Sequence, residues 1–256
     1  MRDNLFASAP SNKWHCNAVA GGKYSQPYAY MLGYYKAGEK LASLVIREGR
    51  DQDVLFFPIC FNYRHYVELT LKNLILNAEK YYFLLRGLEP ESFGPKLNRS
   101  FLFPKKRKFH CIFPKSMTNT RVRWKSDKTK KFRLTATHNL KTLLQMLIDR
   151  LRLISNEKFD NDIRNVILDL SEMDPKGQTF RYGLLKNGVF SIDNKINFDI
   201  IKIFKNMEEV YYYLSGIDIF LTENIDLAME YLYQTQEESH SLESELQFDE
   251  LDYYDY

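Results

Sequence analysis

The strongest constraint on this chain is an uninterrupted run, from Pro58 to Arg86, that contains no glycine and no second proline. At about 1.5 Å per residue, its 29 residues would make a helix about 44 Å long. Asp51 or Asp53 can cap its start, and Gly87 follows its end. The apolar residues that recur at helical spacing and predict its buried face are Phe61, Leu71, Leu74, Ile75 and Ala78.

Four further segments have the apolar period of an amphipathic helix. Ser25 and Thr137 are suitable N-caps, Asp174-Pro175-Lys176-Gly177 is a stop signal, and Ser215-Gly216 is a candidate break in the last segment. Only 11 Gly and 8 Pro occur in 256 residues, which argues against a turn-rich, all-β fold. The chain is therefore expected to be mainly α, with helices also over residues 25–49, 137–151, 163–173 and 197–233.

Two segments are expected to contain β-structure. Alternating stretches flank Lys186-Asn187-Gly188, and Asn-Gly is a strong signal for a tight hairpin turn. Residues 179–193 therefore predict a short β-hairpin. Alternating stretches also occur in residues 92–134, which interrupt the helical pattern between the second and third helices. This insertion is expected to be small, basic and partly β.

The insertion has a concentrated positive charge. From Lys105 to Arg133 there are twelve Lys or Arg residues against one acid, with aromatic residues interleaved. Cations neutralise phosphates and aromatic rings stack on bases, so the pattern is typical of a nucleic-acid surface. The alternative is a solvated loop that covers the helices or docks the acidic C-terminus. The candidate nucleic-acid-binding residues are Lys105, Lys106, Arg107, Lys108, Arg121, Arg123, Trp124 and Lys125.

The C-terminus has the opposite charge. Eight acidic residues and no Lys or Arg occur from Glu237 to Tyr256, whereas the remaining chain has 36 basic and 25 acidic residues. Such a tail is usually disordered, and it either aids solubility or folds back on a basic surface as a mimic of nucleic acid. The expected organisation is an arm at residues 1–26, a helical domain at 27–235 and a disordered acidic tail at 236–256.

Cysteine content and hydropathy favour a soluble protein of a reducing compartment. The three cysteines are an odd number and form no C-x-x-C pair, which disfavours a disulfide framework. The longest apolar stretch, Val54 to Phe61, is too short to span a bilayer, so we expect a cytoplasmic protein without membrane association. His15-Cys16 and His110-Cys111 could offer zinc ligands, but neighbouring strand side chains point to opposite faces. We therefore expect no metal and no cofactor.

Three charged residues on the long helix form one stripe, because Arg64, Glu68 and Lys72 are spaced four apart. Glu68 can pair with either cation, which would give an ion-pair ladder along the helix. In the functional alternative, Arg64 and Lys72 bind a phosphate while Glu68 orients them. His138 lies at the start of another helix, where it can make a helix-entry hydrogen bond or act as a general base or acid beside a phosphate.

Four short segments, in the order given, carry a family resemblance. They are Tyr63-Arg64-His65-Tyr66-Val67-Glu68-Leu69-Thr70-Leu71-Lys72, Thr137-His138-Asn139-Leu140, the helix from Ile163 to Leu170, and Phe180-Arg181-Tyr182. Together they resemble the HEPN family of small helical bundles (higher eukaryote and prokaryote nucleotide-binding). The resemblance covers residues 28–86 and 137–182, which is under half of the chain. Two departures, Asn139 where the family has Asp and Gly183 where it has Pro, bear on catalysis more than on the fold.

The resemblance implies an up-down bundle of four to five helices that often dimerises. Members act in defence, toxin–antitoxin and RNA-processing systems. Many are metal-independent ribonucleases with an Arg-x(4–6)-His motif, and others bind nucleotides or partner proteins. Arg133 and His138 match that motif, which implies them as a catalytic pair, with Arg64, Glu68 and Arg181 as further site residues. In a homodimer the two copies of the pair would meet at the seam.

The sequence therefore predicts a HEPN-like bundle with a basic, partly β insertion and a short hairpin. The leading interpretation of its function is binding of RNA or a nucleotide in a bacterial defence or toxin–antitoxin system, in which a protein from the same operon could be a partner. One alternative is a metal-independent endoribonuclease that uses Arg133 and His138. Another is a non-catalytic dimeric scaffold or antitoxin.

Overall fold

The structure is a computed structural model of the chain. It describes residues 26–86, 134, 136–184, 188–192 and 196–251, together with residues 13, 15 and 18, and for residues 236–251 it describes the backbone alone. The candidate nucleic-acid residues from Lys105 to Lys125 lie outside these ranges, as does Arg133. The strands and the RNA contacts expected of the basic insertion therefore stay predictions.

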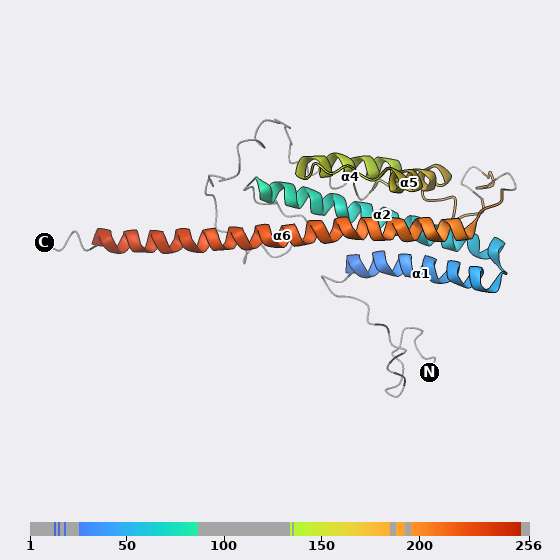
Figure 1. Ribbon diagram of the computed structural model, residues 1–256, viewed down its shortest axis with the longest axis horizontal. Coiled ribbons are helices and arrows are strands. Elements are labelled where there is room, and N and C mark those ends of the chain that lie inside the picture. The colour runs from blue at the N-terminus through green and yellow to red at the C-terminus, as the bar shows by residue number, and fades with distance from the viewer. Residues whose placement is uncertain are drawn as a thin grey trace.

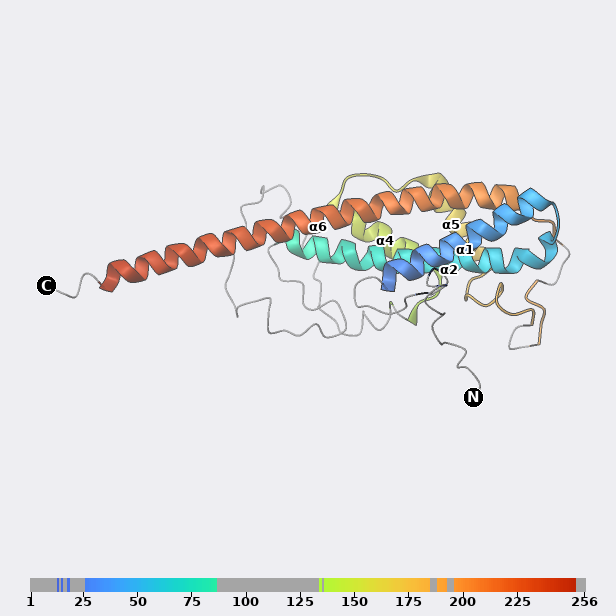
Figure 2. The ribbon, with the colours of Figure 1, turned by 90° about the horizontal axis from the view of Figure 1, so that it is seen from below.

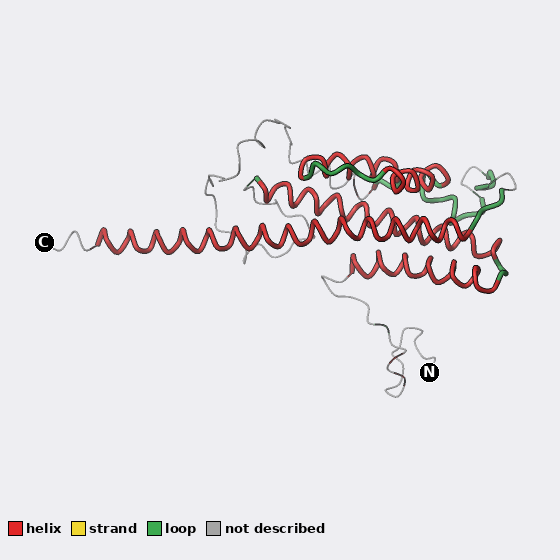
Figure 3. The backbone as a smooth tube through the Cα atoms, viewed as in Figure 1, coloured by secondary structure: helices red, strands yellow, loops and turns green. Residues whose placement is uncertain are grey.

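Five α-helices make up most of the described chain (Figure 1). No strand occurs in the described ranges, as Figure 3 shows, and one isolated β-bridge joins Leu184 to Phe190 there. The prediction of a mainly α protein is therefore confirmed, and the helices pack as a bundle. The helices are α1 (Gln26–Glu48), α2 (Gln52–Leu85), α4 (Leu140–Ile154), α5 (Asn161–Met173) and α6 (Ile200–Leu251).

Helix α2 is the centre of the bundle, because α1, α4 and α6 all pack against it. In the view of Figure 1, α4 and α5 lie on one side of α2 and α1 lies on the other. Its buried residues are distributed around the helix, as expected for a helix with neighbours on several sides. Leu71, Leu74, Ile75 and Ala78 are fully buried, as the sequence predicts, whereas Phe61 is only partly buried.

A tight turn joins α1 to α2. Gly49 has a left-handed φ of 64°, and its N–H donates to the carbonyl of Val45 at 2.8 Å, which ends α1 as predicted. Asp51 occupies the N-cap position of α2 with a left-handed φ of 62° and makes no side-chain capping bond. The other candidate cap, Asp53, lies within the first turn of α2.

Side chains cap the starts of α4 and α5. The Asn139 carboxamide oxygen accepts from the N–H of Thr142 at 2.9 Å, so Asn139, and not the predicted Thr137, is the N-cap of α4. The helix begins immediately after Asn139 because Leu140 is the first fully buried residue of its apolar face. Asp160 caps α5 by accepting from two backbone N–H groups of its first turn.

Helix α6 continues without interruption from Ile200 to Leu251. The break predicted at Ser215-Gly216 is wrong, because Leu214 and Leu221 on either side are fully buried and a glycine within a helix costs only about 1 kcal/mol. The helix also includes residues 236–251, for which we expected disorder. This part contains no glycine or proline, and it projects beyond the other helices in both Figure 1 and Figure 2.

The segment after α5 contains a turn in place of the first predicted hairpin strand. Residues 179–181 form this turn, and the N–H of Arg181 donates to the carbonyl of Gln178 at 3.1 Å. Because such N–H groups have local acceptors, they are not available to a strand ladder. Of the predicted hairpin, residues 185–187 and 193 lie outside the described ranges, and within the described residues the pairing is one isolated antiparallel bridge, between Leu184 and Phe190.

The close packing of α1 on α2 depends on Gly38. A β-carbon built at this position would lie 2.9 Å from Cδ1 of Tyr63, closer than carbon atoms in van der Waals contact. The Tyr63 ring is fully buried and packs against Tyr35 at a centroid distance of 6.1 Å, so it has little room to move. Gly33, on the same helix, has nothing within 4 Å of such a β-carbon.

We expect Gly38→Ala to lower the free energy of unfolding by about 1–2 kcal/mol, because overpacking outweighs the gain in helix propensity. The control is Gly33→Ala, which should raise the free energy of unfolding by up to about 1 kcal/mol. Urea unfolding followed by circular dichroism measures both changes. Equal effects of the two substitutions would contradict the close contact between α1 and α2.

Candidate functional site

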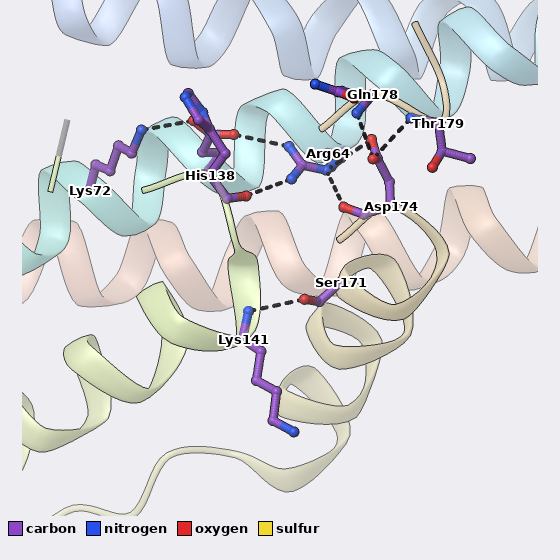
Figure 4. A network of polar contacts seen from close by, with 9 residues as sticks. Arg64, Lys72, His138, Lys141, Ser171, Asp174, Gln178 and Thr179 are labelled. Atoms are coloured by element: carbon purple, nitrogen blue, oxygen red, sulfur yellow. Dashed lines mark hydrogen bonds and ion pairs between the residues drawn. The ribbon is translucent and has the colours of Figure 1, made fainter. Parts of the chain in front are cut away.

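A buried guanidinium lies where α2 meets the start of α4 and the end of α5. The Arg64 residue is only 3% exposed. Its Nη1 donates to Glu68 Oε2 at 2.9 Å, its Nη2 to the His138 carbonyl at 2.6 Å and its Nε to the Asp174 carbonyl at 3.1 Å. Figure 4 shows these contacts from close by. Arg64 thus ties together three segments that are distant in the sequence.

Asp174 shapes the turn that follows α5. Its buried carboxylate accepts from the N–H groups of Gln178 and Thr179 at 2.7 and 3.0 Å through Oδ1. Its Oδ2 lies 3.1 Å from Arg64 Nε, whose hydrogen is directed at the Asp174 carbonyl, so this contact is an ion pair without a hydrogen bond. Gly177 has a left-handed φ of 72°, and a β-carbon there would lie 3.1 Å from Arg64 Nη1. The turn therefore fits tightly against the guanidinium.

Glu68 is the second member of the network. Its Oε1 accepts from Lys72 Nζ at 2.8 Å and lies 2.8 Å from His138 Nδ1, while its Oε2 accepts from Arg64. Both ion pairs of the predicted ladder are therefore present. Burial raises the pKa of the Glu68 carboxyl, but hydrogen bonds from Lys72, His138 and Arg64 outweigh it and hold the pKa below its usual range.

His138 is held at two points and still reaches solvent. Its carbonyl accepts from Arg64, and its Nδ1 faces Glu68, yet 57% of its side chain is exposed. With a proton on Nδ1 directed at the carboxylate, Nε2 faces away from Glu68 and can act on a bound molecule. A carboxylate that fixes the orientation and tautomer of an imidazole is a recurring arrangement in acid–base catalysis.

A pocket of about 440 Å³ opens beside this network. His138, Lys176 and Arg181 contribute nitrogen-bearing side chains to its wall. The Arg181 guanidinium lies 5.7 Å from the centre of the Phe61 ring and 5.4 Å from that of Tyr182, which are cation–π distances. The full lining consists of Phe61, Arg64, His65, Glu68, His138, Lys176, Gly177, Gln178, Arg181, Tyr182 and Leu184.

A small aromatic cluster fixes the turn that carries Lys176 and Arg181. Phe180, which directly precedes Arg181, is buried against Phe56 at a centroid distance of 6.0 Å. Phe56 in turn stacks on Phe198, just before α6, at 4.3 Å. This cluster anchors the backbone, so the adjacent exposed side chain of Arg181 extends from a fixed point.

His65 forms part of the apolar wall of the pocket. Its ring stacks on Phe61 at 5.6 Å and meets Tyr34 edge-on at 4.4 Å. Burial lowers the pKa of the His65 imidazole, and the attraction of Glu68 only partly opposes that effect. His65 is therefore neutral near pH 7 and is not one of the pocket's cations.

The site includes four of the five candidate catalytic residues. Arg64, Glu68, His138 and Arg181 come together at the pocket, whereas Arg133 and all eight candidate nucleic-acid residues lie outside the described ranges. All three guanidinium nitrogens of Arg64 donate to protein acceptors, so Arg64 is not placed to bind a phosphate as the functional alternative required. Lys72 likewise pairs with Glu68 and does not line the pocket.

Sequence reasoning missed the part of the site that follows α5. Asp174 and Gly177 are recognisable in the sequence only as a helix stop, although they build the turn against Arg64. Lys176 lies between them and lines the pocket. The sequence did contain a signal for this turn. Asp174 can accept hydrogen bonds from the backbone N–H groups that follow it, and Gly177, three residues later, favours a turn.

Several other kinds of site are absent from the described ranges. They contain no group of three His, Cys, Asp or Glu side chains arranged to hold a metal ion. Burial raises the pKa of the Cys60 thiol to about 12, so this cysteine is not a nucleophile. None of the helices described is both long and apolar enough to cross a bilayer.

Comparison with known proteins gives no assignment. No family model, no curated protein and no solved structure matches this chain. The function has to be inferred from the residues of the pocket and the network behind it.

The network makes stability depend on pH through Glu68. Because its folded pKa lies below the ordinary value of 4.5, the ionised carboxylate stabilises the fold above that pH, and this stabilisation is lost as pH falls further. At pH 7 we expect Glu68→Gln to lower the free energy of unfolding by about 3 kcal/mol. The difference from wild type should shrink below pH 4.5.

Urea unfolding at pH 7, 5 and 3.5 measures this difference. The control is Glu39→Gln, which removes the partly exposed partner of the exposed Lys36 and should change the free energy of unfolding by less than about 0.5 kcal/mol. If Glu68→Gln lowers the free energy of unfolding equally at all three pH values, the charge of Glu68 does not stabilise the fold.

Proposed function

We propose that the pocket beside His138 binds the phosphate of an RNA strand or of a nucleotide. The observation that carries this proposal is that His138, Lys176 and Arg181 all line the same pocket. Lys176 and Arg181 are exposed, and neither forms an ion pair with any other residue that the structure describes. Their charges are therefore available to an anion.

The acids near the pocket do not oppose an anion. Glu68 is paired with Arg64 and Lys72, and Asp174 lies against Arg64. A phosphate that enters the pocket would meet cations and hydrogen-bond donors without facing an unpaired carboxylate. Charge-assisted bonds of this kind are among the stronger polar interactions of proteins.

The aromatic residues that line the pocket suit a nucleobase. Phe61 and Tyr182 line the pocket, and the guanidinium of Arg181 lies near both rings. Stacking of a base on such a surface contributes about 1–3 kcal/mol and depends little on which base it is. The pocket volume of about 440 Å³ is in the usual range for small-molecule sites and would suit one nucleotide unit of a single strand.

The resemblance to the HEPN family supports the same function. Its segments around Arg64, His138 and Arg181 all contribute residues to this site. Membership of that family would imply an RNA-directed role in a bacterial defence or toxin–antitoxin system, acting as a homodimer or with a partner protein. The candidate nucleic-acid residues of the basic insertion, from Lys105 to Lys125, would then supply further phosphate contacts.

Removal of the two pocket cations should weaken binding. We expect Lys176→Ala with Arg181→Ala to raise the Kd for a fluorescein-labelled single-stranded RNA at least tenfold, because two phosphate contacts are lost. The salt dependence of the Kd should also become less steep. Fluorescence anisotropy between 50 and 200 mM salt measures both effects.

The control is Lys40→Ala with Arg47→Ala, which removes two exposed charges from α1 without touching the pocket. It should change the Kd by less than about threefold, through long-range electrostatics alone. Equal losses for the two double variants would contradict a site in the pocket, and the absence of any RNA or nucleotide binding would favour the scaffold alternative.

A second function, metal-independent ribonuclease activity, is favoured by the contact of His138 with Glu68. In that reaction His138 Nε2 takes the proton of a ribose 2′-OH, whose oxygen attacks the adjacent phosphorus. The bond from phosphorus to the 5′-oxygen breaks, the 5′-oxygen takes up a proton from water, and the RNA ends in a 2′,3′-cyclic phosphate. A cation must stabilise the charge that develops at phosphorus, for which Arg181 and the family-implied Arg133 are the candidates.

If this reaction occurs, His138→Ala should reduce cleavage by about a hundredfold or more, whereas the Kd for RNA should rise less than it does in Lys176→Ala with Arg181→Ala, which removes two charges. EDTA should have no effect. Gel analysis of a labelled RNA, with detection of the cyclic phosphate, measures the reaction. The control is His240→Ala near the C-terminal end of α6, which should cleave as wild type does. Cleavage that survives His138→Ala would exclude this histidine as the base.

A further inference from the structure

An exposed phenylalanine lies beside the pocket, at the isolated β-bridge. Phe190 is 63% exposed, and it belongs to neither of the two hydrophobic clusters found among the described residues. It is also not one of the residues that line the pocket. Packing of the described bundle therefore does not account for an aromatic ring at this position, and the ring is open to a ligand.

The bridge places Phe190 on the same face as Leu184, which lines the pocket. The N–H of Ser191 donates to the carbonyl of Gly183 at 3.0 Å, so the bridged residues between these two groups form a non-hydrogen-bonded pair. In such a pair the Cα atoms lie about 4.5 Å apart, and both side chains stand on one face. Phe190 therefore borders the pocket at Leu184.

The segment that carries Phe190 is anchored to the bundle. Ile192, two residues later, packs against the buried cluster of Phe56, Cys60 and Phe180. Phe180 itself precedes the bridge, so the chain is attached to the same cluster on both sides of it. An aromatic ring on such a fixed backbone loses little conformational entropy when a ligand binds.

Charge near the bridge does not oppose a nucleic-acid strand. Residues 182–192 contain one lysine and no acidic residue. The pocket of about 440 Å³ suits one nucleotide, so the next base of a strand has to lie at its rim. An exposed aromatic ring at that rim provides a surface on which this base can stack.

We propose that Phe190 stacks on the base adjacent to the one in the pocket. The site then takes two successive nucleotides of a single-stranded RNA in preference to a mononucleotide. This inference rests on the proposed function of the pocket, and it decides between the RNA and the nucleotide named there. Because stacking depends little on base identity, the selection is for the length of the strand and not for its sequence.

The first experiment compares ligands that differ in the second base. The probes are adenosine 5′-monophosphate, adenosine 3′,5′-bisphosphate and a 5′-phosphorylated ApA whose first ribose is 2′-O-methylated to prevent cleavage. Competition against a fluorescein-labelled RNA on the full-length chain measures each Kd. We expect the dinucleotide to bind at least tenfold more tightly than either mononucleotide, although the bisphosphate carries as many phosphates.

The second experiment removes the ring. Phe190→Ala should raise the Kd for the dinucleotide about tenfold and leave that for adenosine 5′-monophosphate within about twofold, because the pocket is unchanged. Phe190→Trp should keep the preference for the dinucleotide. The control is Tyr212→Ala on α6, an aromatic residue of similar exposure (65%) that does not line the pocket, which should leave all three Kd values unchanged. Circular dichroism should show that the variants fold.

The two proposals fail in different ways. If the wild type binds the dinucleotide no more tightly than the bisphosphate, or if Phe190→Ala keeps the preference, the second base site is overturned while the pocket remains a nucleotide site. If the wild type binds none of the three probes, the proposed function and this inference are both overturned.

Discussion

The guanidinium of Arg64 is the contact on which the candidate site depends. It lies on the central helix α2, is almost fully buried, and bonds to Glu68, to the carbonyl of His138 and to the carbonyl of Asp174. A buried arginine is costly unless charges and acceptors surround it, and here two carboxylates and two carbonyls do so. The start of α4 and the turn after α5 are thereby held at fixed positions relative to α2.

This arrangement divides the charged residues into two groups. Arg64, Lys72, Glu68 and Asp174 form a network in which two cations and two carboxylates compensate one another, so its role is to position other residues. His138 and Arg181 are attached to that framework but keep exposed side chains at the pocket. The residues proposed to meet a phosphate are therefore supported by residues that do not meet it, as a preorganised site requires.

The elements set by local periodicity were predictable from the sequence, whereas those set by tertiary contacts were not. The absence of breakers between Pro58 and Arg86 predicted α2, and four-residue spacing predicted the pairing of Glu68 with its neighbours. The turn at Asp174 was not foreseen as part of a site, because its meaning depends on Arg64, 110 positions earlier. The first predicted hairpin strand contains a turn at residues 179–181, because local hydrogen bonds satisfy N–H groups there. The continuity of α6 through Gly216 likewise depends on buried leucines on either side.

The most direct measurement of the central claim is the response of the His138 ring to a ligand. The ring carbon-bound protons of the five histidines can be followed by nuclear magnetic resonance, with His138 assigned by its loss in His138→Ala. On titration with adenosine 5′-monophosphate, we predict a saturable shift of the His138 resonances that is lost in Lys176→Ala with Arg181→Ala. His138 resonances that stay unchanged while the nucleotide binds, or a shift that persists in the double variant, would contradict the assignment of this pocket.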